Sequence, residues 1–365
     1  MRIALLTEIP APFRVPLFDA LAAQPDVELR VFFLAANDPR RNYPRVEQHF
    51  RSEVLPSRDF SIGGRWIVAN GGVTSRLRRD RPDVVLIGGW NQAAFWEAAS
   101  WARRARVPLL VWVESTARDE RSGATLLELA KRLMLRAAAG FVVPGRAAAE
   151  YLVSLGADPD RIAVAPNAVD LSLFEAGVAR ERQRRDELRR DLGLDRCTFL
   201  CVSRLSREKG VDLLVRAFEG VPAELAAVGD GPDRELVRSL AGENVRLLGR
   251  IEHDDLLRWY AAADAFVMPS RSETWGMAMQ EAAAAGLPLV ATEAPGAGWD
   301  LIEEGVNGYR VPVEDVEALR AALVRVADDP GWRARAATCT RELAAGYTAE
   351  AWATAVAELA RSRAS

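Results

Sequence analysis

The sequence predicts an α/β protein with parallel sheets in two domains. Short apolar runs of strand length alternate with stretches of helical length, which is the pattern of parallel β-strands joined by helices. The 365 residues exceed what a single hydrophobic core usually holds, and a hydrophobic fraction of 49% is sufficient to fill two cores. We therefore expect two doubly wound domains, each built around its own parallel sheet.

The N-terminal half is expected to begin with a strand at residues 3–7 and a helix at residues 15–23. Further strands are expected at residues 31–34, 84–87, 109–113 and 141–143, and helices at residues 92–104 and 124–138. Residues 38–72 are rich in Arg, Pro and Gly, which indicates a long irregular loop or a small excursion. Residues 165–170 end this half of the chain.

The C-terminal half is expected to follow the same alternation. A charged stretch at residues 180–191 predicts a solvated helix, and an apolar strand at residues 198–202 leads into a helix at residues 211–218. A later strand at residues 265–268 precedes an Ala-rich helix that ends at Gly286. The last helix is expected at residues 349–361.

Two glutamates follow this later strand. Glu273 lies in a polar loop, and Glu281 lies within the Ala-rich helix. Backbone N–H groups of Gly276, Met277 and Ala278 can bind a phosphate at the helix N-terminus, while Glu281 can accept hydrogen bonds from a ribose diol. An ordinary βα unit with two solvated carboxylates is the alternative, and the spacing alone leaves both interpretations open.

Two cations follow the strand at residues 198–202. Arg204 and Lys209 are expected to project from its carboxyl end, where open α/β sheets bind ligands. Two fixed positive charges at this edge can neutralise a diphosphate leaving group. Lys209 is one of only two lysines in the chain, the other being Lys131, which weakens the interpretation of an incidental surface charge.

A glycine turn, Gly229-Asp230-Gly231-Pro232, closes another strand and leads into a helix. Glycine at these positions allows a close approach of the backbone or a positive φ. A tight turn without any ligand explains the tetrapeptide at least as well, so the motif by itself does not predict a binding site.

These motifs, in this order, resemble those of the family-4 glycosyltransferases of the GT-B fold. The family patterns S-R-x-x-x-x-K-G, G-D-G-P, and E-x₇-E followed by A-x-x-x-G-x-P are all present. The resemblance implies two Rossmann-like doubly wound domains that face each other across a cleft. It implies an acceptor-side domain at residues 1–168, a nucleotide-sugar donor domain at residues 169–345, and a helix at residues 346–365 that packs back on the N-terminal domain.

The resemblance also implies the roles of the site residues. Arg204 and Lys209 would bind the donor diphosphate, Glu273 would contact the donor sugar, and Glu281 would bind the ribose. The positions implied for donor binding are Gly229, Asp230, Gly231, Arg250, Ile251, Gly276, Met277, Ala278 and Glu281. Transfer would retain the anomeric configuration and would use neither a metal nor a cofactor, the nucleotide-diphosphate-sugar being the donor substrate. Polysaccharide or glycoconjugate biosynthesis is the expected setting.

The N-terminal half departs from the family pattern. Relatives often have a Gly-Gly loop after the first strand and a histidine near the donor sugar, but here the loop carries Glu8 and Arg14. His49 and His253, the only histidines, match no such position. The candidates for contact with an acceptor or the donor sugar are Glu8, Arg14, Trp90 and Glu114. A helix-capping salt bridge between Glu8 and Arg14 is an equally good alternative, and the other two residues could simply be part of a cleft wall.

Composition excludes some classes of partner and location. A net charge of −3 gives no reason to expect nucleic acid, although residues 1–180 carry 24 basic and 20 acidic groups. Three cysteines are too few for a disulfide framework, no apolar run reaches the ~18 residues of a membrane span, and no signal peptide is recognised. We therefore expect a cytoplasmic protein.

Contact with the inner face of a membrane remains a further expectation. Residues 126–139 carry Lys131, Arg132 and Arg136 among leucines, a basic amphipathic pattern that can lie on anionic lipid. A core-packed helix with a solvated basic face is the simpler alternative.

Two other functions fit the same fold. A non-hydrolysing nucleotide-sugar epimerase would use carboxylates and histidines, and the position of both histidines outside the motifs disfavours it. A nucleotide-sugar-binding protein with weak catalysis fits the altered N-terminal half but not the intact motifs. The expected partners of a transferase are a nucleotide sugar and a glycan, lipid-linked or small-molecule acceptor.

Overall fold

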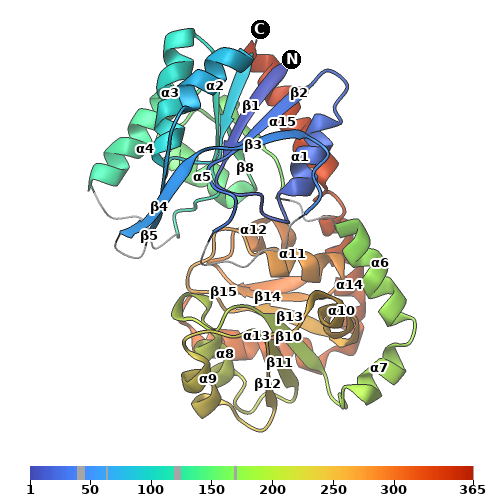
Figure 1. The fold of residues 1–365 in the computed structure, drawn as a ribbon. Coiled ribbons are helices and arrows are strands. Elements are labelled where there is room, and N and C mark those ends of the chain that lie inside the picture. Colours follow the sequence, from blue (N-terminus) through green and yellow to red (C-terminus); the bar gives the residue numbers. More distant parts are fainter. Residues whose placement is uncertain (39–45, 63–64, 119–124, 168–170, 365) are drawn as a thin grey trace. The chain divides into compact units, whose positions relative to one another are not determined.

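The chain forms two compact units (Figure 1). The computed structural model describes residues 1–38, 46–62, 65–118, 125–167 and 171–364. The N-terminal unit comprises residues 1–117, 121–169 and 347–365, and the C-terminal unit comprises residues 118–120 and 170–346. Within the described residues, no helix is both long and apolar enough to cross a membrane.

The N-terminal unit is built on a parallel sheet. Among the described residues the sheet has seven strands, in the order β3 (Arg51–Val54), β2 (Glu28–Phe33), β1 (Arg2–Thr7), β6 (Val84–Ile87), β7 (Leu109–Trp112), β8 (Gly140–Val143) and β9 (Ile162–Val164). Its helices are α1 (Val15–Ala22), α2 (Val73–Asp80), α3 (Ala93–Ala105), α4 (Thr125–Ala137), α5 (Arg146–Ser154) and α15 (Ala349–Ala364), with a 3₁₀ turn at Pro159–Arg161.

Both faces of this sheet are buried, because successive side chains of a strand point to opposite faces. Ala4 and Leu6 of β1 face a core shared with α2, α3, α4 and α5. Ile3 and Leu5 face a second core shared with α1 and α15. Burial on both faces explains why these strands appear as continuous apolar runs in the sequence.

The last helix of the chain belongs to the N-terminal unit. Trp352 of α15 is fully buried, and its ring centroid lies 6.0 Å from that of Phe18 and 5.1 Å from that of Trp112. Figure 1 shows α15 beside α1. A helix from the end of the sequence thus completes the core that begins with the first strand.

Of the two alternatives for residues 38–72, a long irregular loop or a small excursion, the irregular loop is wrong for residues 51–54, 57–62 and 65–70, which form strands. Strand β3 extends the sheet beside β2, and β4 (Ser57–Ile62) pairs with β5 (Arg65–Asn70) in an antiparallel hairpin. β3 is largely exposed, so it lacks the apolar run that predicts a strand. Its Glu53 accepts hydrogen bonds from Arg30, Arg76 and Arg79 instead. Residues 39–45 lie outside the described part.

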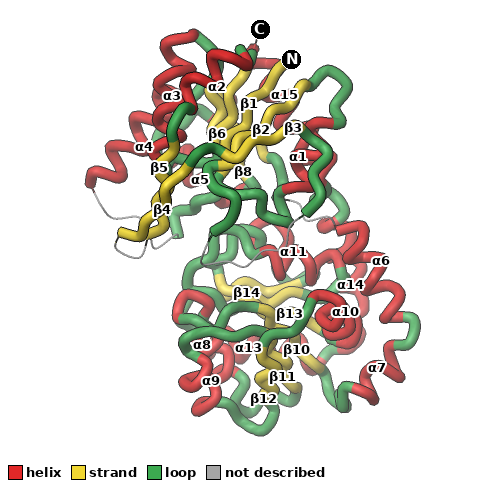
Figure 2. Tube along the Cα trace, in the orientation of Figure 1, coloured by secondary structure: helices red, strands yellow, loops and turns green. Residues whose placement is uncertain are grey.

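The C-terminal unit contains a second parallel sheet (Figure 2). Among the described residues it has six strands, in the order β12 (Val245–Gly249), β11 (Glu224–Val228), β10 (Thr198–Val202), β13 (Ala265–Met268), β14 (Leu289–Thr292) and β15 (Gly308–Val311). Its helices are α6 (Leu171–Arg182), α7 (Arg185–Asp191), α8 (Val211–Ala217), α9 (Arg234–Leu240), α10 (His253–Ala262), α11 (Met277–Ala284), α12 (Gly298–Leu301), α13 (Val316–Asp328) and α14 (Pro330–Ala344), with a 3₁₀ turn at Arg207–Lys209.

The charged stretch at residues 180–191 spans the end of α6 and all of α7 and is exposed along much of its length, but three of its arginines bind other parts of the unit. Arg185 and Arg189 bind the two carboxylate oxygens of Asp264 at 2.7 and 2.9 Å. Arg182 donates to the backbone oxygen of Ala285, the C-cap of α11, at 2.7 Å. These half-buried arginines therefore link α6 and α7 to the rest of the unit, and charge density in the sequence cannot distinguish such arginines from fully solvated ones.

Candidate active site

The donor-side candidates lie where the strand order of the C-terminal sheet reverses. β10 and β13 are hydrogen-bonded neighbours, and the chain continues from β10 to β11 on one side and from β13 to β14 on the other. Such a reversal leaves room for a ligand at the carboxyl ends of the strands. Arg204 and Lys209 follow β10 and Glu273 follows β13, so the two loops meet at this edge.

Lys209 and Glu273 are in direct contact. The ammonium group of Lys209 donates to Oε2 of Glu273, and the two side chains are 24% and 17% exposed. The backbone N–H groups of Arg271 and Ser272 both donate to the backbone oxygen of Glu208, at 2.8 and 3.1 Å, which joins the two loops. The ion pair is therefore held on a fixed backbone and is partly shielded from water. In such a partly shielded position two charges attract each other more strongly than on an open surface.

Arg204 does not join this pair. Its side chain is exposed, and its guanidinium forms no hydrogen bond or ion pair within the described residues. Arg250, also exposed, and the half-buried Ile251 follow β12. The backbone N–H of Gly229 donates to Gly249 at 2.8 Å, so the loop after β12 reaches the same edge of the sheet.

The glycine turn is explained by the contact of two backbones. A Cβ at Gly229, whose φ is +136°, would lie 1.8 Å from the backbone oxygen of Ser203, and a Cβ at Gly231 would lie 2.2 Å from that of Leu205. The backbone N–H of Leu205 donates to the backbone oxygen of Asp230 at 3.0 Å, so the loops after β10 and β11 are packed together. Contact of these glycines with a donor stays a prediction.

Helix α11 begins at the same edge. Gly276 is its N-cap, with a φ of +107° that favours glycine. The buried Trp275 donates its indole N–H to Oε1 of Gln280 at 2.8 Å, which fixes the preceding loop on the first turn. The first N–H groups of a helix have no partner within the helix, so those of Met277 and Ala278 can bind an anion.

Glu281 contacts a residue that the motifs do not include. The hydroxyl group of Tyr260, in α10, donates to Oε2 of Glu281 at 2.8 Å. Tyr260 is fully buried, and burial together with the charge of Glu281 raises the pKa of Tyr260 well above its ordinary value. Sequence reasoning missed Tyr260 because nothing in the spacing connects α10 with α11.

In the N-terminal unit, Arg14 and Glu114 meet at the carboxyl edge of the sheet. Arg14 donates to Oε2 of Glu114 at 3.3 Å and to Oγ1 of Thr7 at 3.0 Å, and it lies 4.8 Å from the centroid of the Trp112 ring. Asn167 donates to Oε1 of Glu114 at 3.2 Å. Thr7 ends β1, and the other two partners follow β7 and β9, so groups from three strands converge. Thr7 and Asn167 are not among the site candidates from the sequence, although Asn167 lies in the segment at residues 165–170 that ends the N-terminal half.

Glu8 belongs to a separate cluster. Asn91 and Gln92 donate to its Oε1 at 2.7 and 3.2 Å. Gln92 is buried, and its own amide oxygen accepts a hydrogen bond from the backbone of β5 at 3.0 Å. The alternative of a capping salt bridge between Glu8 and Arg14 is therefore wrong, because each has other partners. Trp90 is half-buried against the core of the unit.

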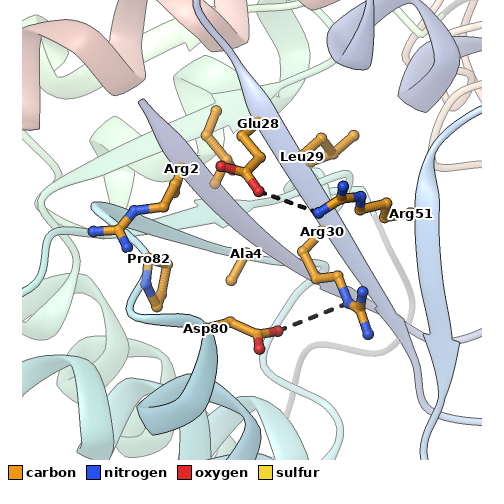
Figure 3. Close-up of a pocket in the computed structure, with 9 residues that line it drawn as sticks. Arg2, Ala4, Glu28, Leu29, Arg30, Arg51, Asp80 and Pro82 are labelled. Atoms are coloured by element: carbon orange, nitrogen blue, oxygen red, sulfur yellow. Dashed lines mark hydrogen bonds and ion pairs between the residues drawn. The ribbon is translucent and has the colours of Figure 1, made fainter.

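A charged pocket of about 130 Å³ lies elsewhere in the N-terminal unit (Figure 3). It is beside Arg2 and Glu28, the first residues of β1 and β2, at the end of the sheet opposite the candidates. Glu28 pairs with Arg51 at 3.4 Å and Asp80 with Arg30 at 3.7 Å, so these charges are already matched. In the described part of the chain, no group of three or more His, Cys, Asp or Glu residues could hold a metal ion.

Two family descriptions match the chain. Residues 196–329 match "Glycosyl transferases group 1" and residues 16–168 match "Glycosyl transferase 4-like domain". A D-inositol 3-phosphate glycosyltransferase from Xylanimonas cellulosilytica is 32% identical over 283 residues, which are 71% of this chain and 67% of that protein. The chain belongs to the group 1 glycosyltransferases of family 4. The predicted class of enzyme, a nucleotide-sugar-dependent glycosyltransferase, is thereby confirmed.

Other relatives of this glycosyltransferase extend the comparison. A GDP-mannose-dependent monoacylated alpha-(1-6)-phosphatidylinositol monomannoside mannosyltransferase from Corynebacterium glutamicum is 33% identical over 186 residues, 46% of this chain and 48% of that protein. The crystal structure of Anabaena Alr3699/HepE in complex with UDP superposes with a TM-score of 0.76 at 22% identity, covering 99% of this chain and 100% of that chain. The predicted fold class, two parallel α/β units of the GT-B type, is confirmed.

Proposed function

We propose that this glycosyltransferase moves a hexosyl group from a nucleotide-diphosphate-sugar to an acceptor hydroxyl, with retention of configuration and without a metal. The observation that carries the proposal is the pairing of Lys209 with Glu273 at the reversal point of the donor-side sheet. It unites a cation suited to the diphosphate and a carboxylate suited to sugar hydroxyls on one fixed edge.

Helix α11 supports the donor assignment. Its N-terminus at Gly276 can bind a phosphate through backbone N–H groups, and the helix dipole favours the negative charge. Glu281 lies four residues beyond Met277, about 6 Å further along the helix axis at 1.5 Å per residue. This separation suits a ligand whose phosphate and ribose are adjacent, as in a nucleotide.

The chemistry requires positive charge at the leaving group. When the bond between the anomeric carbon and the diphosphate breaks, negative charge develops on the phosphate and positive character on the sugar. Lys209, the exposed Arg204 and the start of α11 would stabilise the diphosphate, and removal of one such donor commonly lowers turnover about a hundred- to a thousandfold. In retaining transfer the departing phosphate oxygen would accept the proton of the acceptor hydroxyl. Glu273 would orient the sugar and would not act as a nucleophile.

The donor is proposed to be a UDP or GDP sugar. One relative is named for GDP-mannose, and one structure of the same fold contains UDP. Arg250 and Ile251, together with the glycine turn at Gly229, Asp230 and Gly231, are the residues proposed to contact this donor. A thermal-shift panel of nucleotide sugars tests the choice: a stabilisation by neither UDP nor GDP sugars contradicts it.

The acceptor is proposed to bind near Glu8, Arg14, Trp90 and Glu114 in the N-terminal unit. The carboxylate of Glu8 receives two neutral amide hydrogen bonds, and no cation pairs with it among the described residues. A carboxylate has more acceptor positions than these two hydrogen bonds use, so Glu8 can also accept hydrogen bonds from hydroxyl groups of an acceptor. The proposed acceptors are a glycan, a lipid-linked glycan or a small hydroxylated molecule, in polysaccharide or glycoconjugate synthesis within the cytoplasm.

Peripheral membrane contact through α4 is a second part of the proposal. Leu129 and Leu133, one helical turn apart, are 55% and 50% exposed, and Arg132 and Arg136 beside them are also exposed. Lys131 does not belong to this surface, because it is buried and donates to the hydroxyl of Tyr151 at 2.6 Å. Of the three basic residues in this pattern, only Arg132 and Arg136 are therefore exposed.

Flotation with anionic vesicles tests this contact. The wild-type protein should float at low salt and should lose binding at high salt, because lipid headgroup attraction is screened. Leu129→Ser with Leu133→Ser should abolish flotation, whereas Leu236→Ser, a change of an exposed leucine in the other unit, should leave it unchanged. No flotation of the wild-type protein rejects the contact.

The assay that distinguishes the candidate functions measures the release of nucleoside diphosphate with and without an acceptor. A transferase releases nucleoside diphosphate only when an acceptor is present, an epimerase converts the donor sugar without that release, and a binding protein does neither. Membership in the glycosyltransferase family favours the first outcome. Acceptor-dependent release with retention, read from the anomeric configuration of the product and unaffected by a chelator, supports the proposal. Inversion or loss of activity with chelator contradicts the corresponding part of it.

A further inference from the structure

The carboxylate of Glu281 is held by a hydroxyl group from a different helix. Tyr260 of α10 donates to Oε2 of Glu281 at 2.8 Å, while the backbone oxygen of Ala278 lies 3.3 Å from the same hydroxyl. The hydroxyl has one proton, and a hydrogen bond to an ionised carboxylate is stronger than one to a neutral carbonyl. Glu281 is therefore the main acceptor, and one of its two oxygens has a defined position.

Tyr260 is itself fixed on several sides. Its ring is fully buried and stacks on Phe266, with centroids 6.3 Å apart and planes 19° apart. The ring of Phe174, in α6, meets it edge-on at 5.1 Å and 80°. Such contacts leave the ring little freedom, so the hydroxyl group points at a constant place on α11. Because its pKa lies well above the ordinary value, the hydroxyl stays protonated and remains a donor at neutral pH.

Helix α6 also holds the other end of α11. Arg182 of α6 donates to the backbone oxygen of Ala285 at 2.7 Å, and a cation at a helix C-terminus stabilises the carbonyl groups there. Burial lowers the pKa of Arg182 to about 10, so it is still charged at neutral pH. Two side chains of α6 thus fix Tyr260 and α11 relative to each other.

We propose that Tyr260 is a positioning residue for ribose recognition: its hydroxyl orients the carboxylate of Glu281 so that this carboxylate accepts hydrogen bonds from the ribose diol of a nucleotide. The inference rests on the proposed role of Glu281 in the donor site. A glutamate on a helix surface has several rotamers and must lose that freedom when it binds a ligand. Because Tyr260 already holds the Glu281 side chain in the unbound protein, less conformational entropy is lost when the nucleotide binds.

The experiment compares nucleotides that differ only in the diol. Dissociation constants of UDP and GDP and of their 2′,3′-dideoxy counterparts are measured by calorimetry on the full-length protein. The ratio of the dissociation constant of the dideoxy nucleotide to that of the ordinary nucleotide measures the contribution of the diol, because the phosphates and the base are the same in both. In the wild-type protein we expect a ratio of about ten to a hundred, the range that follows from hydrogen bonds to a charged group.

Tyr260→Phe should lower this ratio about three- to tenfold, which corresponds to the loss of one positioning hydrogen bond. Glu281→Gln should lower it further, and adding Tyr260→Phe to Glu281→Gln should change it little, because the hydroxyl acts through the carboxylate. Tyr309→Phe is the matched control, because this tyrosine lies on β15 and stacks on Trp332. The ratio of dissociation constants measured for this variant should equal that of the wild-type protein.

The outcomes separate this inference from the proposed function. The inference is supported if Tyr260→Phe lowers the ratio in the wild-type background but changes it little in the Glu281→Gln background. If wild type discriminates but Tyr260→Phe keeps the wild-type ratio, the inference is overturned and the donor site stands. Should Tyr260→Phe not fold, Phe174→Leu, which keeps the hydroxyl but removes the edge contact, must lower the ratio or the inference is likewise overturned. If wild type binds neither nucleotide, or binds both forms equally, the role of Glu281 fails and this inference with it.

Discussion

Lys209→Ala tests the donor site through two effects that the structure separates. The substitution removes the positive charge proposed to stabilise the diphosphate, and it leaves Glu273 without its ion-pair partner. The first effect acts on turnover, and the second acts on the stability of the C-terminal unit. Both can be measured on the same protein.

The magnitudes follow from the geometry of the pair. Loss of a preorganised charge at the leaving group should lower turnover about a hundred- to a thousandfold. A hydrogen-bonded charged group left without its partner destabilises by about 1–3 kcal/mol, and the remaining 17% exposure of Glu273 places the expectation at the lower end, about 1–2 kcal/mol. For a unit of this size that corresponds to a decrease in Tm of about 2–8 °C.

The assay combines initial rates of acceptor-dependent nucleoside diphosphate release with thermal unfolding. Lys209→Ala with Glu273→Ala removes both partners, so it should recover most of the lost stability without recovering turnover. Arg207→Ala is the matched control, because it removes an exposed cation from the same 3₁₀ turn and should alter both quantities only slightly, by about 0.5 kcal/mol at most. Turnover of Lys209→Ala close to that of the wild type refutes the reasoning.

Three further substitutions test the fold around the two candidate regions. Gly229→Ala should destabilise the C-terminal unit by about 3 kcal/mol or more, because its φ is +136° and the added Cβ would lie 1.8 Å from a backbone oxygen. Gly220→Ala is the control: its φ is +77° and nothing lies within 4 Å of the added Cβ, so it should destabilise by only about 1–2 kcal/mol. Equal urea midpoints for the two variants would contradict the steric argument. Glu53→Gln tests the charged edge of the N-terminal sheet: burial raises the pKa of Glu53, but hydrogen bonds from Arg76, Arg79 and Arg30 outweigh this and lower it to about 2, so its stabilisation is complete above the ordinary pKa of 4.5 and is lost as the pH falls toward 2. The variant should flatten the dependence of Tm on pH between about pH 5 and pH 2, and an unchanged slope counts against this assignment. Trp352→Ala should destabilise the N-terminal unit by about 3–5 kcal/mol in chemical denaturation, since it empties a fully buried site between α15 and α1; a loss below 1 kcal/mol would show that α15 contributes little to that core.

The apolar strands and the motif loops could be predicted from the sequence. Residues 84–87, 198–202 and 265–268 coincide with observed strands, because a strand buried on both faces must be apolar throughout. The edge strand β3 and the hairpin of β4 and β5 could not be predicted in this way. β3 is stabilised by arginines on β2 and α2, and such charged partners leave no apolar periodicity in the sequence.

The candidate site divides in the same manner. Lys209, Glu273 and Glu281 are specified by local spacing, since each sits at a set distance from the end of a strand or the start of a helix. Tyr260 and Asn167 carry no such signal, because they reach Glu281 and Glu114 from elements that are distant in the sequence. Whether Glu8 pairs with Arg14 was equally undecidable from their positions in one loop.

The amino-acid sequence by itself therefore determined the fold class, the family and the order of the motifs in the C-terminal half, because the apolar pattern of buried strands and the residues of turns are local features of the sequence. Only the tertiary structure decided which partner each polar side chain has: Glu273 for Lys209, Tyr260 for Glu281, and the amides of Asn91 and Gln92 for Glu8. The physical reason is that a hydrogen bond depends on distance and direction in space. Those are set by how strands and helices far apart in the chain pack against one another.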